Sequence, residues 1–408
     1  MRILSLTASA LFLAAACSQQ ASDTTGTSPG APEETSASED EAGSGTQMQE
    51  TEAEALISKD GFRLIAVATG LTFPWDMLFL PDGTMLITER DGAIRILRDG
   101  ELLPDPVAGT PEAHVNAQGG YFAMALDPDF SSNRKLYLAF AKGVDEENTT
   151  AVVSGVLSED ASELTDVQEI FTGAPRETSH HYGGRLAFLP DGTLIITLGE
   201  GFRYMEEAQN PQNYQGTIVR LNTDGSFPDD NPFIDGEDGT PGVWSYGHRN
   251  VQGLVWDNAR EILWAHEHGP KGGDELNRIE SGKNYGWPAI TYGVNYDGTI
   301  ISEETEAPGM EQPVIKWVPS IAPSGMALVS GDVWPEWQGD LIIGAMNGPR
   351  GQKLVHVMLD EEGNVTGQTD LMADLEIPFR DVVIGPDGNL YAATANMDGV
   401  IYRIDRNE

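Results

Sequence analysis

The sequence predicts an all-β protein, a six-bladed β-propeller that occupies residues 57–408 of the 408. A short turn-and-strand motif recurs six times, and successive copies lie 47 to 78 residues apart. Repeats of this size made of short strands are typical of propeller blades. Few segments between the copies show the periodicity of a helix, and the best candidate for a helix is 205–212. A two-sheet sandwich would also supply many strands, but it does not explain six similar units.

The first segment of the chain has the features of a secretory signal. Residues 1–17 contain one basic residue, an apolar run and a small-residue end, and they are too short for a membrane span. Cys17, the only cysteine, follows three alanines, and this arrangement resembles a bacterial lipoprotein signal in which the cysteine is lipidated. Ordinary cleavage after Ala16 is the alternative. We therefore expect a periplasmic or cell-envelope protein that is lipid-anchored at Cys17.

The next segment, 18–56, is expected to be a disordered acidic tether. It consists mainly of Ser, Thr, Gly, Glu, Asp and Ala, and such a composition buries too little apolar surface to fold. The whole chain has a formal net charge of −40, from 64 acidic and 24 basic residues. This charge argues against nucleic acid and against anionic membrane surfaces as partners. Contact with a membrane is expected only through the N-terminal lipid.

The six copies of the motif share an apolar pair, a Pro-Asp-Gly turn or a close variant, and a short strand. The turn residues favour tight reversals, and the flanking residues are β-formers. We expect each copy to form the hairpin of one blade. The copies are 79–90, 126–140, 188–200, 255–267, 333–346 and 384–396.

Polar residues gather in the segments between these hairpins, most densely in 243–288. Buried polar groups must be hydrogen bonded or bound to a ligand, so these segments are expected to line a ligand site on one face of the propeller. The segments are 116–120, 179–185, 247–252, 266–275, 347–353 and Arg380.

Two of these segments carry groups suited to catalysis. His181 lies beside glycines at a strand entrance, and a histidine is suited to general-base work because its pKa is near physiological pH. Glu200, at the end of the following strand, is placed to orient the imidazole. Arg249 offers paired donors for a carboxylate or a quinone oxygen. The alternatives are surface histidines and a structural arginine.

The segment 267–275 mixes carboxylates with carbonyls exposed by glycines. Hard oxygen ligands of this kind favour Ca²⁺ over zinc. The chain has no GxGxxG at a strand–helix junction, no Walker loop and no GxSxG. These absences argue against a nicotinamide enzyme, an NTPase and a serine hydrolase, so an enzyme of this sequence would need a metal or another cofactor.

Several motifs together resemble one family, the bacterial soluble aldose dehydrogenases that depend on pyrroloquinoline quinone (the glucose/sorbosone dehydrogenase family). The resemblance covers about residues 60 to 405 and implies a six-bladed propeller. It also implies oxidation of an aldose at C1 to the lactone, with hydride transfer to the quinone. The matching stretches are HYGGRLAFLPDG, GTIVRLNTDGSFPDDNPF, YGHRNVQGL, EHGPKGGDELNRIESGKNYGWP and FRDVVIGPDGNLY.

The resemblance assigns roles to individual residues. It implies that His181 is the base, with Arg249 and Glu200 completing the catalytic group. The positions it implies for the quinone are Gln118, Arg249, Asn250, Arg380 and Thr394. It implies a cofactor-bound Ca²⁺ on the carbonyls of Gly269 and Pro270, and a second Ca²⁺ at Glu275 and the carbonyl of Tyr285.

Three departures from the family pattern reduce or alter the groups facing the cofactor. Glu200 stands where glucose-type members carry an aspartate. The cofactor lysine has no equivalent near Asn347, where Arg350 or Lys353 would have to substitute, and Pro378 replaces an arginine. Less positive charge facing an anionic cofactor weakens its binding.

Two other functions remain open from the sequence. One is a metal-dependent sugar-lactone or ester hydrolase on a similar propeller, which would need side-chain ligands around an open metal site. The other is a catalytically silent sugar- or ligand-binding propeller. The sequence names neither the sugar nor the electron acceptor, for which a respiratory-chain component or a cytochrome is expected.

Overall fold

The computed structural model describes residues 55–347 and 351–407. The expected signal, Cys17 and almost all of the tether lie outside the described residues, as does Arg350. Within the described part no helix is long and apolar enough to cross a membrane.

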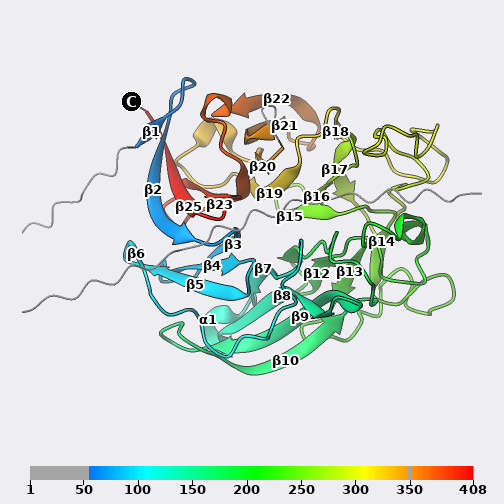
Figure 1. Ribbon diagram of the computed structural model, residues 1–408, viewed down its shortest axis with the longest axis horizontal. Helices are drawn as coiled ribbons and strands as arrows, with labels where there is room; N and C mark the ends of the chain where they lie inside the picture. Colours follow the sequence, from blue (N-terminus) through cyan, green and yellow to red (C-terminus); the bar gives the residue numbers. More distant parts are fainter. Residues whose placement is uncertain (1–54, 348–350, 408) are drawn as a thin grey trace, which may run out of the picture. The chain divides into compact units, whose positions relative to one another are not determined.

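The described chain forms six small antiparallel sheets that follow one another in chain order around a common centre (Figure 1). All six sequence motifs form the first hairpin of a sheet, because each Pro-Asp-Gly-type turn joins two β-forming stretches. The predicted six-bladed propeller is therefore confirmed. The hairpins are β3 (Pro74–Phe79) with β4 (Met85–Glu89), β7 (Tyr121–Leu126) with β8 (Lys135–Val144), β11 (Leu186–Phe188) with β12 (Leu194–Thr197), β15 (Val251–Asp257) with β16 (Ile262–Glu267), β19 (Pro323–Leu328) with β20 (Leu341–Ala345), and β23 (Phe379–Ile384) with β24 (Leu390–Thr394).

Two further strands complete each of the first five sheets on its outer side. They are β5 (Ala93–Arg98) and β6 (Glu101–Leu102), β9 (Glu147–Leu157) and β10 (Leu164–Thr172), β13 (Thr217–Leu221) and β14 (Val243–Tyr246), β17 (Asp274–Ile279) and β18 (Ile315–Trp317), and β21 (Lys353–Leu359) and β22 (Val365–Leu371).

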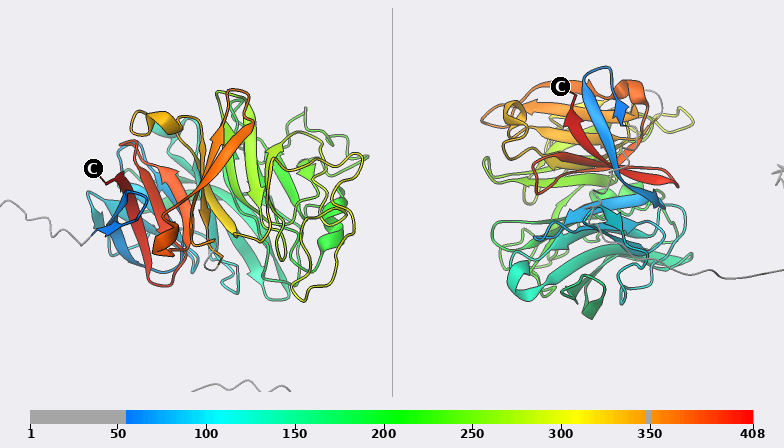
Figure 2. Two further views of the ribbon diagram at one scale, coloured as in Figure 1. Left: turned by 90° about the horizontal axis from the view of Figure 1, so that it is seen from above. Right: turned by 90° about the vertical axis from the view of Figure 1, so that its left-hand side faces the viewer.

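The sixth sheet joins the two ends of the described chain. Its order is β1-β2-β25-β24-β23, so β2 (Phe62–Leu71) and β1 (Leu56–Ile57) extend the C-terminal strands. The last strand, β25 (Gly399–Arg406), pairs antiparallel with β2, and Leu64 lies opposite Ile404. In Figure 2 the blue strand β2 runs beside the red strands of the C-terminus. This pairing closes the ring of sheets.

Helical segments in the described residues are short. The helix expected within 205–212 is a 3-10 turn, η1 (Met205–Gln209). The sequence did not predict α1 (Phe130–Asn133), η2 (Pro335–Trp337) or η3 (Ala373–Leu375). Each has three or four residues, too few for a helical period to show in the sequence.

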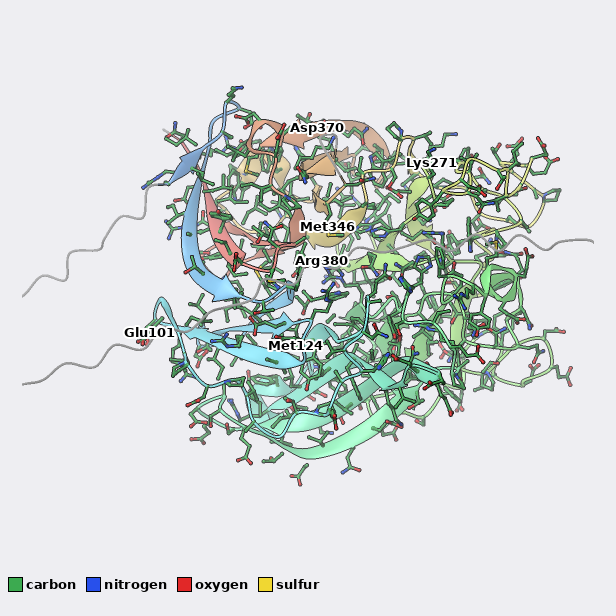
Figure 3. The ribbon with its side chains drawn as sticks, in the orientation of Figure 1. Glu101, Met124, Lys271, Met346, Asp370 and Arg380 are labelled. Atoms are coloured by element: carbon green, nitrogen blue, oxygen red, sulfur yellow. The ribbon has the colours of Figure 1, made fainter. Side chains whose placement is uncertain are left out.

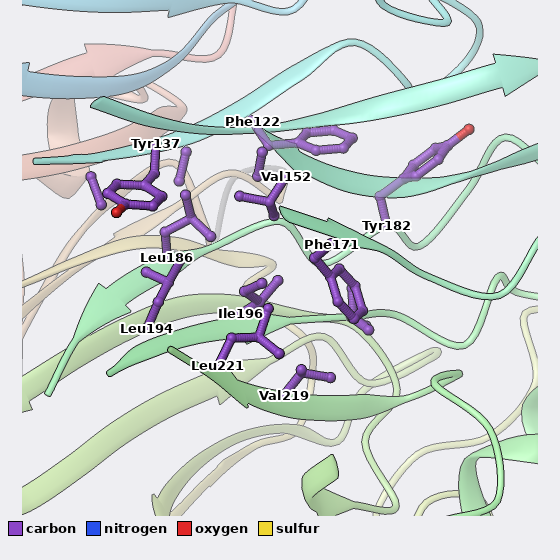
Figure 4. Close-up of a cluster of buried hydrophobic side chains, with 14 of the residues drawn as sticks. Phe122, Tyr137, Val152, Phe171, Tyr182, Leu186, Leu194, Ile196, Val219 and Leu221 are labelled. Carbon is purple, nitrogen blue, oxygen red and sulfur yellow. The ribbon is translucent and has the colours of Figure 1, made fainter. Parts of the chain in front are cut away.

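The hydrophobic core lies between neighbouring sheets. Figure 4 shows one cluster, in which Phe122, Tyr137 and Val152 of the second sheet face Leu186 and Ile196 of the third. Fully burying an aliphatic or aromatic side chain of this size contributes about 1.5–3 kcal/mol, so contacts between sheets hold the ring together.

The topology places the polar segments of the sequence on one face. The first strands of the blades (β3, β7, β11, β15, β19 and β23) contact one another in a ring around the centre. In an antiparallel sheet the start of the first strand and the end of the second strand lie at the same edge. The segments before β7, β11 and β15 and the segments after β16 and β20 therefore meet on the face opposite the six Pro-Asp-Gly-type turns.

Candidate active site

A buried histidine and a buried glutamate form the centre of the site. The Nδ1 atom of His181 lies 2.6 Å from Oε2 of Glu200, and the two side chains are 6 % and 1 % exposed. The backbone N–H of His181 donates to Oε1 of Gln118 at 2.8 Å. Because Nδ1 is engaged by the carboxylate, Nε2 is the ring nitrogen left to accept a proton.

Glycines allow this pair to form. His181 has a φ of +52°, in the left-handed region that costs an L-residue about 1 kcal/mol or more. A Cβ at Gly199 would overlap the carbonyl oxygen of His181, so the segment carrying the histidine rests directly on the end of the Glu200 strand. Glu200 is fixed in turn, since its backbone N–H donates to the carbonyl of Arg249 at 3.0 Å.

The surroundings keep His181 neutral. Burial lowers the pKa of His181, and the nearby Arg249 and Arg176 lower it further, against the opposing effect of Glu200. The pKa of Glu200 is also lowered, because the interactions with His181 and Arg249 outweigh its burial. A neutral imidazole beside an ionised carboxylate is the protonation state that a general base requires.

A cavity of about 220 Å³ opens at the centre of the ring beside this pair. Its wall combines aromatic rings, amides and guanidinium groups, which suits a planar anionic ligand. Figure 3 shows Arg380 and Met346 together near the middle of the molecule. The lining residues are Phe73, Pro74, Trp75, Arg90, Gln118, Phe122, Tyr182, Gly183, Asn250, Gln252, His268, Met346, Arg380 and Ala395.

Arg380 is the buried cation of this cavity. Its guanidinium lies 4.3 Å from the centre of the Trp75 ring, and its Nη2 donates to Oε1 of Gln252 at 2.9 Å. Burial, followed by the charge of Arg185, lowers the pKa of Arg380 to about 9. The Nε atoms of Arg380 and Arg249 have no hydrogen-bond partner among the described residues. A bound anion would supply these partners and offset the cost of burial.

A buried ion network forms the floor below Arg380. Nη1 of Arg185 lies 2.6 Å from Asp76, and Nη2 lies 2.9 Å from Asp381. Burial is the main cause that raises the pKa of Asp76, to about 7, and the neighbouring Asp381 raises it further. These residues come from three different blades, so the network ties the inner strands together and supports the cavity from below.

A second, much smaller cavity of about 10 Å³ lies next to the first. Among its lining residues are Glu267, Gly269, Glu275 and Tyr285, and its volume is about that of one water-sized ion. Burial raises the pKa of Glu275 to about 8, and the like negative charge of Glu267 raises it further. Two carboxylates that line one small cavity suit a divalent cation.

The structure brings three of the four expected metal positions together at this small cavity. Gly269, Glu275 and Tyr285 line it, and Pro270 does not. The carbonyl of Gly269 also accepts from Nη1 of Arg249 at 2.7 Å. Among the described residues no three His, Cys, Asp or Glu side chains converge on one point, so a metal here would depend on backbone carbonyls.

The other predicted residues differ in how closely they approach the large cavity. Gln118 and Asn250 line it. Thr394 is buried, its hydroxyl accepts from the N–H of Val400 at 3.1 Å, and the next residue, Ala395, forms the wall. Lys353 does not substitute for the family lysine, because its Nζ is paired with Asp370 at 2.7 Å and it does not line the cavity.

The sequence reasoning missed the first-blade wall of the cavity. Arg90 follows β4, and its guanidinium lies 4.2 Å from the centre of the Phe73 ring. The guanidinium groups of Arg185 and Arg380 lie 4.4 and 4.3 Å from the centre of the Trp75 ring. The sequence did hold one indication of this wall. Arg90 stands at the end of the second strand of its blade, which is the position of His268 in the fourth blade.

Comparison with known proteins identifies relatives of most of the described chain. The model of the glucose/sorbosone dehydrogenase family matches residues 71–403. The aldose sugar dehydrogenase YliI of Escherichia coli is 42 % identical over 339 residues, which are 82 % of this chain and 90 % of that protein.

Solved structures agree with this match. The soluble aldose sugar dehydrogenase of Escherichia coli, in its apo form, is 38 % identical with a TM-score of 0.81, and the match covers 85 % of this chain and 99 % of that one. The PQQ-bound aldose sugar dehydrogenase of Streptomyces coelicolor is 28 % identical with a TM-score of 0.68, and the match covers 84 % of this chain and 97 % of that one.

Proposed function

The chain belongs to the glucose/sorbosone dehydrogenase family, and from this premise we propose that it is a PQQ-dependent aldose dehydrogenase. The proposed reaction removes a hydride from C1 of a cyclic aldose and yields the lactone. The observation that carries the proposal is the His181–Glu200 pair beside a central cavity with an incompletely partnered, buried Arg380.

The described residues fit pyrroloquinoline quinone, a planar tricarboxylate. Arg380 and Arg90 supply positive charge to the cavity wall, and Trp75 supplies a flat apolar surface. Arg249 lines the adjacent small cavity, and its Nε has no hydrogen-bond partner among the described residues. When bound, the quinone supplies the hydride acceptor. This chain lacks the family's cofactor lysine and the arginine that Pro378 replaces, and Arg90 offers a positive charge in their place.

The residues of the chain would handle the proton. Nε2 of His181 would accept the proton of the C1 hydroxyl while the C1 hydride leaves the sugar, so that the sugar loses one proton to the histidine and one hydride, which carries both electrons. Glu200 would hold the imidazole through Nδ1 at 2.6 Å and stabilise its protonated form. The lowered pKa of His181 keeps Nε2 free to accept at neutral pH.

We extend the proposal to Ca²⁺ and to cellular location. The cofactor-bound Ca²⁺ would be held by the carbonyls of Gly269 and Pro270, of which Gly269 lines the small cavity. The same cavity fits a second divalent cation, held by Glu275 and the carbonyl of Tyr285. This cation would be a structural ion close to Arg249. Residues 1–17 support export to the cell envelope with a lipid at Cys17. The electron acceptor is proposed to be a redox partner of the respiratory chain.

Reconstitution tests the dehydrogenase proposal. The purified protein is titrated with PQQ in the presence of Ca²⁺, and binding is followed by quenching of tryptophan fluorescence, for which Trp75 is the reporter in the cavity. Dye reduction is then measured with a panel of aldoses. We expect His181→Ala to bind PQQ as the wild type does and to lose turnover by roughly 10²–10⁴-fold.

Arg380 provides a matched binding variant. We expect Arg380→Met to weaken PQQ by about 30-fold or more, since it removes a desolvated cation from the site. Absence of quenching in the wild type would contradict the proposal and favour the silent binding propeller. Ester or lactone hydrolysis without quinone would favour the hydrolase instead.

A further inference from the structure

Arg176 is a buried cation that lies behind the His181–Glu200 pair. The residue is 5 % exposed, and its guanidinium lies 4.4 Å from the centre of the Tyr182 ring. Its Nη1 donates to the carbonyl of Gly199 at 3.1 Å, whereas Nε and Nη2 have no hydrogen-bond partner among the described residues. Within this part of the chain no carboxylate is therefore hydrogen bonded to the cation.

The segment that leads into His181 also grips the residues on either side of Glu200. Arg176 holds the carbonyl before Glu200, and the hydroxyl of Thr178 donates to the carbonyl of Gly201 after it. The contact is close, since a Cβ at Gly201 would lie 2.6 Å from Cδ of Arg176. One short segment therefore fixes the histidine and the glutamate relative to each other.

Packing alone does not account for a cation at this place. Taking a guanidinium out of water is costly unless an acidic partner is hydrogen bonded to it. Burial lowers the pKa of Arg176 to about 10, against the opposing effects of Tyr182 and Glu200, so the group still carries its charge at neutral pH. An apolar side chain of similar length would fill the same space without this cost. The charge itself therefore has a role, and Glu200 and His181 are the groups on which it acts.

The titratable groups that face His181 come from several segments of the central face. Only Glu200 favours the protonated imidazole, whereas Arg249 and Arg176 disfavour it. Arg249 also lines the small cavity, but Arg176 lines neither cavity and can be changed without altering their walls. The groups are Glu200, Arg176, Arg249, His268 and the neighbouring His180.

We propose that Arg176 is a positioning residue of the reaction, which holds Glu200 against His181 through the Gly199 carbonyl and whose charge opposes protonation of the imidazole before the sugar arrives. This proposal rests on the proposed aldose dehydrogenase function and adds a residue that lines neither the central nor the small cavity. A base that is already protonated cannot take the proton of the C1 hydroxyl. Arg176 would therefore extend the activity to lower pH.

Titration of His181 tests the proposal without turnover. The full-length, quinone-free protein with ¹³C-labelled histidine rings is followed by NMR as the pH is varied, and His181→Ala identifies the signal among the seven histidines. In Arg176→Met we expect the midpoint of His181 to rise by about half a pH unit or more, because a nearby buried charge is lost. Arg176→Lys keeps the charge and should leave the midpoint close to that of the wild type.

Arg134→Met is the matched control. Arg134 also donates to a backbone carbonyl, that of Leu157 at 2.7 Å, and its guanidinium lies 5.2 Å from the centre of the Phe130 ring. It lies between β7 and β8, on the face opposite the site, so its loss should leave the midpoint of His181 unchanged. Arg176→Gln keeps an N–H donor without the charge, and it takes the place of Arg176→Met if the methionine variant folds poorly.

A kinetic arm uses the PQQ-loaded enzyme. In Arg176→Met the midpoint of the rise of kcat/KM with pH should move upward as the titration does. The plateau at high pH should fall about tenfold, because Glu200 is held less firmly against the base. Arg176→Lys should restore the midpoint and part of the plateau. The affinity for PQQ should stay unchanged in each Arg176 variant, since this residue lines neither cavity.

The two proposals fail in different ways. An unchanged His181 midpoint in Arg176→Met, or an equal rise in Arg176→Met and Arg176→Lys, overturns the role of Arg176 while the dehydrogenase stands. A midpoint that rises only when the charge is removed supports the action of Arg176 on His181, even in a protein that oxidises no aldose. In that case only the dehydrogenase proposal is contradicted.

Discussion

Replacing Arg185 by Met should expose the cost of the buried ion network. In the wild type Arg185 lies 2.6 Å from Asp76 and 2.9 Å from Asp381, and all three side chains are less than 10 % exposed. Methionine keeps much of the apolar volume but removes the cation, so both carboxylates stay buried without it. Breaking a buried ion pair on one side costs about 3–5 kcal/mol. For roughly 350 folded residues this corresponds to a fall in Tm of about 4–7 °C.

The pH dependence of this loss distinguishes an electrostatic effect from a packing defect. Burial and Asp381 raise the pKa of Asp76 to about 7, above its usual value of 3.8. A carboxyl with a raised folded pKa favours the folded state at low pH, and this contribution is lost as the pH rises through the folded pKa. At pH 5.5 Asp76 is protonated in wild type and variant alike, so the difference should be small. At pH 8.5 the variant must bury charge that the wild type neutralises, so the difference should be largest.

Arg220→Met is the matched control. Arg220 is equally buried, at 5 % exposed, but its partners Asp191 and Asp230 are 47 % and 75 % exposed and remain solvated when it is lost. We expect a loss of about 1 kcal/mol or less. Both variants are measured by urea unfolding at pH 5.5, 7 and 8.5. A loss in Arg185→Met of less than about 1 kcal/mol at pH 8.5, or one that does not change with pH, would refute the reasoning.

Three further predictions concern the site. The kcat/KM should rise with pH through a pKa below 6.5, because the free enzyme needs neutral His181. Glu200→Gln should shift this rise to lower pH and slow turnover, since the carboxylate raises the pKa of His181. A wild-type kcat/KM that rises through a pKa at or above 6.5 would contradict this prediction. Gly199→Ala should cut kcat/KM by at least about tenfold with PQQ affinity little changed, since a Cβ there would displace the carbonyl of His181; wild-type kinetics would exclude this contact. Chelation with EGTA should lower the Tm of the wild type by several degrees and leave that of Glu275→Gln unchanged; equal shifts would place the cation elsewhere.

The blades were predictable from the sequence because their signal is local. Each Pro-Asp-Gly-type turn and its flanking strands lie within about fifteen residues, and the alternation of strands then places the polar segments on one face. The pairing of His181 with Glu200 was also within reach, because the two residues stand at the ends of one hairpin.

Long-range features were not predictable in the same way. The pairing of β2 with β25 joins the two ends of the fold, and no local sequence pattern predicts it. Arg90 and Trp75 reach the cavity only because the first and sixth blades become neighbours when the ring closes. The orientation of the Thr394 hydroxyl toward Val400 depends on strand pairing within the last blade.

The closing pair of strands has a consequence for how the protein is made. Strand β2 is synthesised near the beginning of the chain, yet its partner β25 is synthesised last. Until then β2 presents a free edge, and free edges are where one chain adds to another. Pairings this distant along the chain also form slowly. A chain that ends before Gly399 would leave both β2 and β24 unpaired on one side, so we expect premature termination or C-terminal trimming to yield aggregates, not a slightly weakened enzyme.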